Sequence, residues 1–165
     1  MMKKIAFIFL SMGIFPAVAF SQLKTKPKCG DFVVDILNGN VSGMKPGFTE
    51  AEIKVGLPCF TSAEDEDAKS KCGGGVFYAD RDVYFYTQRD YIEIGENFKG
   101  QLSIPLLGAD RSSLFRWLGN PKLSDDGWDA FQTAYGTLVL HYNKDNKVRL
   151  IQFSSRSTET LNLCE

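Results

Sequence analysis

Two short helix-like segments constrain the fold of this chain more than any other feature. The first lies between Gly47 and Pro58, the second between Gly108 and Pro121, and each ends in a Gly-x-Pro turn. The glycine allows the helix to end and the proline prevents it from continuing. Helices of about two turns are marginal alone, so both segments must be held against a sheet.

The residues around each segment specify how the helix begins and ends. Thr49 and Glu52 have the spacing of a capping box, and Asp110 can cap the second helix. Gly56 and Gly119 are predicted to take positive φ where the helices end. The apolar positions predicted to face the core are Ile53, Leu57, Leu114, Phe115 and Leu118.

Each helix is preceded by one strand-like run and followed by three, all rich in aromatic and β-branched residues. The runs are 32–37, 75–79, 82–87 and 91–95 in the first half, and 101–106, 130–135, 137–142 and 147–154 in the second. The pattern predicts an α+β fold of two tandem β-α-β-β-β repeats, with an antiparallel sheet and short helices packed on one of its faces. The predicted units are residues 22–97 and 98–165.

This arrangement of glycine, capping residue, apolar anchor and Gly-x-Pro turn, followed by a β meander, resembles the repeat of the β-lactamase inhibitor protein superfamily. A single copy of the same unit occurs in the small outer-membrane lipoprotein of the β-barrel assembly machinery. The resemblance covers both halves of the chain after residue 21. The first copy departs from it, being shortened before Gly56 and carrying an acidic loop after Pro58. The resemblance implies an inhibitor or an assembly module, but the matching positions are scaffold and assign no contact residue.

Residues 1–21 have the organisation of a secretory signal peptide. Lys3 and Lys4 precede an apolar run, residues 5–15, that is too short to span a bilayer. Small residues follow, and cleavage after either Ala19 or Ser21 is compatible with the pattern, with Ser21 preferred. Loss of the two lysines changes the net charge from −1 to −3. We therefore expect a periplasmic or secreted protein with no transmembrane segment in the mature chain.

The overall composition excludes two classes of protein. The chain is 44% hydrophobic and 24% charged, which is too apolar for a disordered protein. Its near-neutral charge also argues against nucleic acid as a partner, because such binding relies on a positive field.

Four cysteines remain after the leader, and an even number in an exported protein indicates disulfides. Three pairings are possible in principle. Because chain termini often lie close together, the expected pairs are Cys29 with Cys164 and Cys59 with Cys72. A metal site is disfavoured because there is no Cys-x-x-Cys and His141 is the only histidine.

No motif of a hydrolase, metalloprotease or phosphate-binding loop is present. A lone histidine on a strand is more often structural than catalytic, and alternation places His141 on the face opposite Leu138 and Leu140. We therefore expect no enzymatic activity, no catalytic residue, no cofactor and no metal.

Two groups of residues are candidates for binding a protein partner. Glu64, Asp65 and Glu66 belong to an acidic run that is either a solvated loop tip or an anionic plug for a basic cleft. Alternation in the run 82–87 places Tyr84 and Tyr86 on one face, where they are either exposed or buried in a two-sided sandwich. Exposed tyrosine and tryptophan are typical of protein-binding surfaces, which adds Trp128 to the candidates.

These features together predict an exported, non-enzymatic protein-binding protein. The hypothesis is a periplasmic inhibitor or immunity protein that occludes the active site of an envelope-targeting hydrolase or toxin. The alternative is an envelope structural or outer-membrane assembly module.

Overall fold

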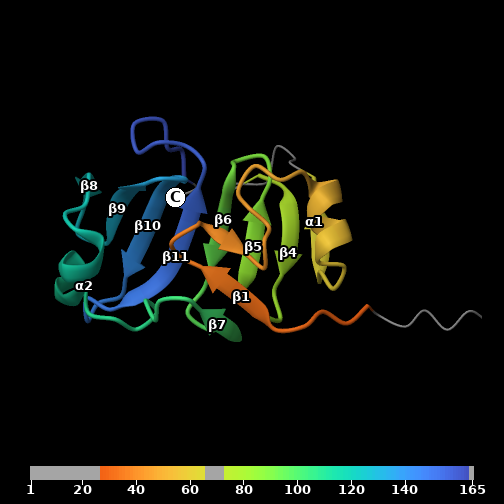
Figure 1. Ribbon diagram of the computed structural model, residues 1–165, viewed down its shortest axis with the longest axis horizontal. Coiled ribbons are helices and arrows are strands. Elements are labelled where there is room, and N and C mark those ends of the chain that lie inside the picture. The colour runs from red at the N-terminus through yellow and green to blue at the C-terminus, as the bar shows by residue number, and fades with distance from the viewer. Residues whose placement is uncertain (1–26, 66–72, 164–165) are drawn as a thin grey trace, which may run out of the picture.

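The computed structural model describes residues 27–65 and 73–163, which form two sheets and two short helices (Figure 1). The predicted leader, Glu66, Cys72 and Cys164 lie outside these residues. The larger sheet has eight strands in the order β3-β4-β5-β6-β11-β10-β9-β8, and every neighbouring pair is antiparallel. The smaller sheet has the order β2-β1-β7. The strands are β1 (Phe32–Asp35), β2 (Asn40–Val41), β3 (Ser62–Glu64), β4 (Gly75–Tyr78), β5 (Val83–Tyr86), β6 (Tyr91–Ile94), β7 (Gly100–Leu102), β8 (Leu123–Ser124), β9 (Trp128–Thr133), β10 (Gly136–Tyr142) and β11 (Val148–Ser154).

The larger sheet has one apolar face, which we call the front face. Along the strands, residues that are buried on this face alternate with residues on the opposite face. On β5, for example, Val83 and Phe85 are buried, whereas Tyr84 and Tyr86 are only half-buried. The strand register aligns the buried residues of neighbouring strands on the same side. The front face consists of Val76, Tyr78, Val83, Phe85, Ile92, Ile94, Phe131, Leu138, Leu140, Tyr142, Ile151 and Phe153. The α+β class is therefore confirmed, with a single core on this face.

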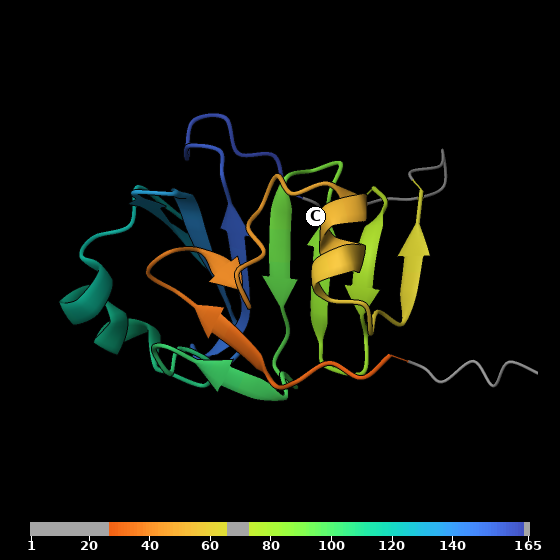
Figure 2. The same ribbon diagram turned by 45° about the vertical axis from the view of Figure 1, so that its right-hand side comes forward.

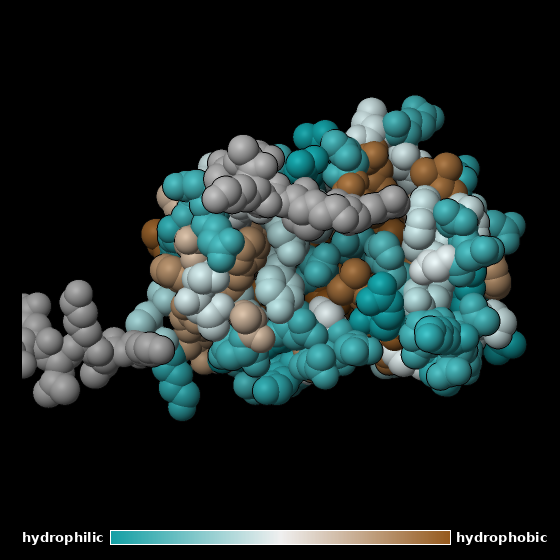
Figure 3. Space-filling view, turned by 180° about the vertical axis from the view of Figure 1, so that it is seen from behind, coloured by the Kyte–Doolittle hydropathy of each residue, from teal (hydrophilic) through white to brown (hydrophobic). Residues whose placement is uncertain are grey.

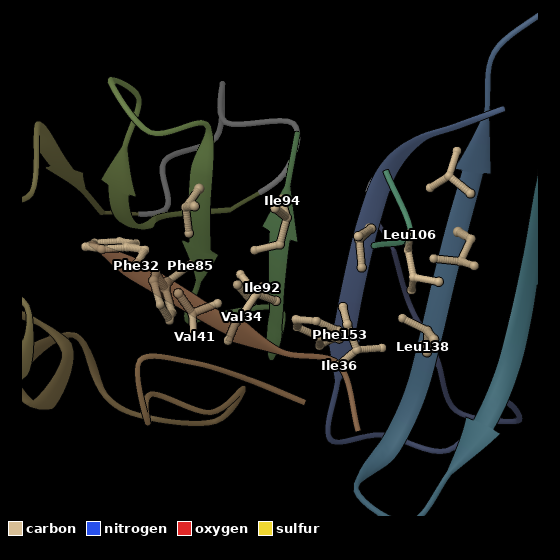
Figure 4. Close-up of a cluster of buried hydrophobic side chains, with 14 of the residues drawn as sticks. Phe32, Val34, Ile36, Val41, Phe85, Ile92, Ile94, Leu106, Leu138 and Phe153 are labelled. Carbon is tan, nitrogen blue, oxygen red and sulfur yellow. The ribbon is translucent and has the colours of Figure 1, made fainter. Parts of the chain in front are cut away.

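The three-stranded sheet and the first helix cover the front face, and the second helix lies at the edge next to β8 and β9 (Figures 1 and 2). Phe32, Val34 and Ile36 of the β1 segment point toward the larger sheet, where they meet Phe85, Ile92 and Phe153 (Figure 4). The ring of Phe32 also lies edge-on to Tyr78, with 5.0 Å between ring centroids. Burial of these side chains on both layers is the main force that holds the layers together.

Helix α1 (Glu50–Gly56) begins as predicted but ends differently. Thr49 and Glu52 form the full capping box, and Ile53 and Leu57 are buried. The expected positive φ at Gly56 is wrong, because the helix continues through this residue and Leu57 is the C-cap. The hydroxyl of Tyr78 donates a hydrogen bond to the carbonyl of Leu57 (2.6 Å), which ties the helix end to β4.

Helix α2 (Arg111–Leu118) departs further from the prediction. Asp110 occupies the N-cap position but makes no side-chain cap; its carboxylate instead pairs with Lys147, 3.2 Å away. Leu114 is buried and Gly119 takes the expected positive φ of 73°. The predicted core position Phe115 is wrong, since its side chain is 45% exposed.

All eight predicted strand runs form strands, but one expected pairing is wrong. The strands before the two helices, β1 and β7, do not join the antiparallel sheet; they pair with each other in parallel. Short runs between turns also form three strands that the pattern did not predict, namely β2, β3 and β8. Neither helix among the described residues is long and apolar enough to cross a bilayer.

The disulfide pairing expected from the sequence is wrong. Cys29 bonds to Cys59, with 5.6 Å between the Cα atoms. The bond joins the segment before β1 to the loop after α1, so it links two parts of the layer that covers the front face. The prediction relied on proximity of the chain ends, whereas the fold places β1 beside the end of α1. With Cys29 and Cys59 joined, neither can pair with Cys164 or Cys72.

Candidate functional site

The face of the larger sheet opposite the helices, which we call the back face, carries the residues most suited to binding. The register places Tyr84 of β5 beside Glu93 of β6, and Glu93 beside Gln152 of β11. On the next two strands, His141 of β10 lies beside Trp128 of β9. Figure 3 shows the molecule from this side, with a surface that mixes polar and apolar residues and is hollowed near its middle. The residues discussed below are Phe77, Tyr84, Tyr86, Tyr91, Glu93, Trp128, His141, Arg149, Leu150 and Gln152.

An aromatic cluster occupies the end of the back face formed by β4, β5 and β6. Tyr86 lies at its centre, stacked on Tyr91 at 4.7 Å and tilted against Phe77 at 5.4 Å, measured between ring centroids. Tyr84 is stacked 6.4 Å from Tyr86. Tyr84 and Tyr86 are half-buried rather than enclosed. Burial, with a smaller contribution from the charge of Glu93, raises the pKa of Tyr86 to about 12, so its hydroxyl stays protonated at neutral pH.

The predicted acidic residues are placed only in part. Glu64 ends β3 and pairs in register with Gly75, so its side chain shares the back face with Tyr86. A side chain at Gly75 would not fit, because an added Cβ would lie 1.9 Å from the carbonyl oxygen of Phe85. Asp65 is exposed just beyond the strand. The structure thus brings Glu64 to the tyrosines that sequence reasoning selected separately.

A row of three hydrogen-bonded polar side chains crosses the middle of the back face. Gln152 is only 2% exposed, and its amide nitrogen donates to the Glu93 carboxylate at 3.0 Å. Its amide oxygen lies 2.7 Å from Nε2 of His141. Because an amide oxygen can only accept, Nε2 of His141 carries the hydrogen in this arrangement. Burial is the main cause that raises the pKa of Glu93, and the Gln152 hydrogen bond only partly offsets it.

Trp128 lies at the opposite end of this row from the tyrosines. It borders a pocket of about 400 Å³ whose other lining residues are Glu93, Asp125, His141, Arg149, Leu150 and Gln152. A register shift between His141 and Tyr142 marks a β-bulge at this point of β11. Bulges re-aim side chains, and here both Arg149 and Leu150 border the pocket although they are consecutive in the chain.

The described segment after β11 packs on the back face at Gln132 and Thr137, and its hydrogen bonds do not involve the residues that line the pocket. Gln132 accepts hydrogen bonds from the backbone and hydroxyl of Thr158. Thr137 donates from its hydroxyl to the carbonyl of Arg156 at 2.7 Å. These contacts anchor the segment at the end of β9 and β10 away from Trp128 and His141, where Gly136 joins the two strands.

A second polar network lies on the front face and has a structural character. Asp129 is 1% exposed and receives two hydrogen bonds from Arg111, at 2.9 and 2.6 Å, and one from Tyr142 at 2.7 Å. Ser124 donates a further short hydrogen bond. Burial alone would raise the pKa of Asp129, but these hydrogen bonds outweigh it and the pKa is lowered. With each oxygen bonded, this carboxylate has no capacity left for a ligand.

The pocket on the back face is bordered by polar and aromatic groups. Within residues 27–65 and 73–163, no three His, Cys, Asp or Glu side chains form a group that could hold a metal ion. Among the described residues, no serine, threonine or cysteine lines the pocket that His141 borders. The pocket offers carboxylate, amide, imidazole and indole groups, which suit recognition.

Sequence reasoning selected Tyr84, Tyr86 and Trp128 but missed Glu93, Arg149 and Gln152. The alternation of Glu93 between two isoleucines could have revealed its face. The position of Arg149 could not have been found in this way, because the bulge interrupts the alternation. The strands that lie beside β11, and therefore the pocket that they form with it, are known only once the order of strands in the sheet is known.

Comparison with family models, with curated proteins and with solved structures found no match to this chain.

Proposed function

We propose that this is an exported, non-enzymatic protein that binds a protein partner through its back face. The observation that carries the proposal is the presence on one rigid sheet of Tyr84, Tyr86 and Trp128, linked by the polar row from Glu93 to His141. Half-buried aromatic side chains on a rigid scaffold give a large contact area at a small entropic cost. The sheet is continuous from β5 to β9, so the two ends of this surface are held in one arrangement.

The partner class we propose is an envelope-targeting hydrolase or toxin whose active site is occluded. The leader-like residues 1–21 and the four cysteines after them support a periplasmic or secreted location. Glu64 and Glu93 give the back face an acidic character. Asp65 is exposed just beyond β3, and Glu66 extends the acidic run in sequence. An acidic, aromatic surface is complementary to a basic cleft.

We further propose that the chain is a tandem repeat of a unit resembling that of the β-lactamase inhibitor protein superfamily. The order β4-β5-β6-β11-β10-β9 supports this, because it is the order that two like meanders give when a twofold axis relates them. Such an axis would make β1 and β7 antiparallel. Their parallel pairing is a departure from the repeat, confined to the front layer.

Affinity purification from envelope extract, followed by an inhibition assay, tests the proposed function. We expect the mature protein to recover a hydrolase and to inhibit it in a saturable manner. Trp128→Ala and Tyr84→Ala should each weaken inhibition about tenfold or more, as truncation of an interface aromatic does. The matched control is Trp117→Ala, which removes a 74% exposed tryptophan from α2 and should leave inhibition unchanged.

Recovery of no hydrolase, together with tight binding to an outer-membrane assembly component, would contradict the proposal in favour of an envelope assembly module. Equal effects of the Trp117 and Trp128 substitutions would show that the back face is not the contact surface.

A further inference from the structure

The pocket between Glu93 and Trp128 has a carboxylate whose charge is incompletely compensated. The only hydrogen bond that described residues give to Glu93 comes from the neutral amide of Gln152, at Oε2. Arg149 also borders the pocket, and its positive charge favours ionisation of Glu93. The two side chains, both among the described residues, form no ion pair. Asp82 lies close enough on the tyrosine side to oppose ionisation of Glu93. A carboxylate that is partly removed from water and forms no ion pair is a strong acceptor for a charged donor.

The acceptor is held in place rather than free to move. Gln152 is almost fully buried and is bonded at both ends, to Glu93 and to His141. The Glu93 oxygen that Gln152 does not use receives no hydrogen bond from the described residues. The network therefore positions one carboxylate oxygen for an incoming donor without any rearrangement of the sheet.

The other walls of the pocket suit a planar cation. Trp128 offers an indole, the best side chain for cation–π contact, and Asp125 adds a second carboxylate to the pocket lining. Carboxylates thus outnumber the single guanidinium of Arg149. A guanidinium can stack on an indole and donate to a carboxylate at the same time, which an ammonium does less well. The volume of about 400 Å³ is at the low end for binding pockets, consistent with a single long side chain.

We infer that this pocket is the receptor for an arginine side chain of the partner, with Glu93 as its acceptor and Trp128 as its stacking surface. The inference rests on the proposed protein-binding function and specifies the chemistry of the partner at one point. Tyr84 lies next to Glu93 in register, so the aromatic cluster adjoins the pocket on the same face.

The test uses a single-residue probe and the mature protein. N-acetyl-arginine amide is titrated to tens of millimolar, since one such contact binds at roughly millimolar strength. Binding is followed by NMR at the Trp128 indole N–H and the Gln152 side-chain amide. We expect saturable shifts at both groups, and none with N-acetyl-citrulline amide, which has the same shape without the charge. Glu93→Gln should weaken binding about tenfold or more, whereas Glu159→Gln, at an exposed acid on the loop after β11, should not.

Absence of shifts with the arginine probe, equal shifts with citrulline, or unchanged binding by Glu93→Gln would each overturn the inference. The citrulline comparison uses the unaltered protein, so it does not depend on folding of a variant. Arginine binding without any hydrolase partner would refute the proposed function and leave the pocket established. Inhibition of a hydrolase that is insensitive to Glu93→Gln would do the reverse.

Discussion

The front and back faces of the same sheet each hold one polar network, and the two networks differ in how completely they are satisfied. On the front face, Asp129 is fully buried, is paired with Arg111 and has hydrogen bonds at both oxygens. On the back face, Glu93 is half-buried, and the described residues give it one hydrogen bond, from a neutral amide. The hydrogen bonds lower the pKa of the first group, whereas burial raises the pKa of the second.

The difference indicates which network serves stability and which serves recognition. A charge that is buried and fully paired is costly to disturb and has nothing left to offer a ligand. A charge that is partly buried and has too few partners lowers the stability of the free protein. A ligand that supplies the missing partner removes this cost on binding. The Asp129 network also ties α2 to the β8–β9 edge, because Arg111 donates to the carbonyls of Asp125 and Asp126.

The largest expected effect comes from breaking the front network. Asp129→Ala should lower the free energy of unfolding by about 3–5 kcal/mol, because it leaves the Arg111 charge and the Tyr142 hydroxyl without their partner. Urea denaturation followed by circular dichroism measures the change. Asp145→Ala, at an exposed position between β10 and β11, is the matched control and should change stability by less than about 0.5 kcal/mol. A loss below about 1 kcal/mol at Asp129 would refute its structural role.

Removal of the front-layer disulfide should have the next largest effect. The double change Cys29→Ser and Cys59→Ser should cost about 3–4 kcal/mol, since the bond closes a loop with a sequence separation of 30. Urea denaturation of the variant measures this cost, and back-face binding should be preserved in the folded fraction.

Peptide mapping of the non-reduced protein checks the pairing directly. It should give a linked pair of peptides that contain Cys29 and Cys59. A link from either of these cysteines to Cys72 or Cys164 would contradict the observed connection.

The aromatic cluster on the back face should show the opposite balance, with more effect on binding than on folding. Tyr84→Ala should lower partner affinity about tenfold or more while changing stability by only about 1 kcal/mol. Phe85→Ala on the same strand is the contrasting variant, because Phe85 is 1% exposed on the front face and its truncation should cost about 3–5 kcal/mol. Similar stability losses for the two variants would remove the distinction between the faces.

The smallest expected effect is a difference in pH dependence between the two carboxylates. The folded pKa of Asp129 is below its ordinary value of 3.8, so its stabilisation is present above pH 3.8 and is lost as pH falls through the folded pKa. The folded pKa of Glu93 is above its ordinary value of 4.5, so its ionisation destabilises the fold at neutral pH. This penalty disappears as pH falls to 4.5.

Glu93→Gln should therefore stabilise the free protein at pH 7 and have little effect below pH 4.5. Asp129→Asn should be destabilising at pH 7, and its deficit should shrink only below pH 3.8. Unfolding free energies measured between pH 3 and pH 8 test both trends. A destabilised Glu93→Gln variant at neutral pH would contradict the underpaired state of this carboxylate.

Local sequence patterns predicted the strands well because alternation is itself a local consequence of burial. Alternation predicted that Tyr84 and Tyr86 share one face of their strand, and the structure confirms this: both are half-buried, whereas Val83 and Phe85 between them are buried on the front face. The capping box at Thr49 was also predictable, since both of its partners lie within four residues. Phe115 was misassigned because a two-turn helix has too few residues to define which side is buried.

The failures concern contacts between residues far apart in the chain. The choice of Cys59 as the partner of Cys29, the parallel pairing of β1 with β7, and the pocket formed by β6, β9, β10 and β11 all depend on the sheet order. Asp129 shows the same limit, because the alternation of β9 places it on the front face but does not supply the Arg111 that makes its burial tolerable.

The sequence alone determined the α+β class, the positions of the main strands and the selection of Tyr84, Tyr86 and Trp128 as a set of aromatic candidates. These features follow from backbone preference and from the period-two exposure of a strand, both of which act over a few residues. Only the tertiary structure decided that these aromatics share one face with Glu64 and Glu93, and that Glu93 is underpaired while Asp129 is not. The pairing of a buried charge depends on which distant strand lies beside it, and that is set by packing of the whole sheet.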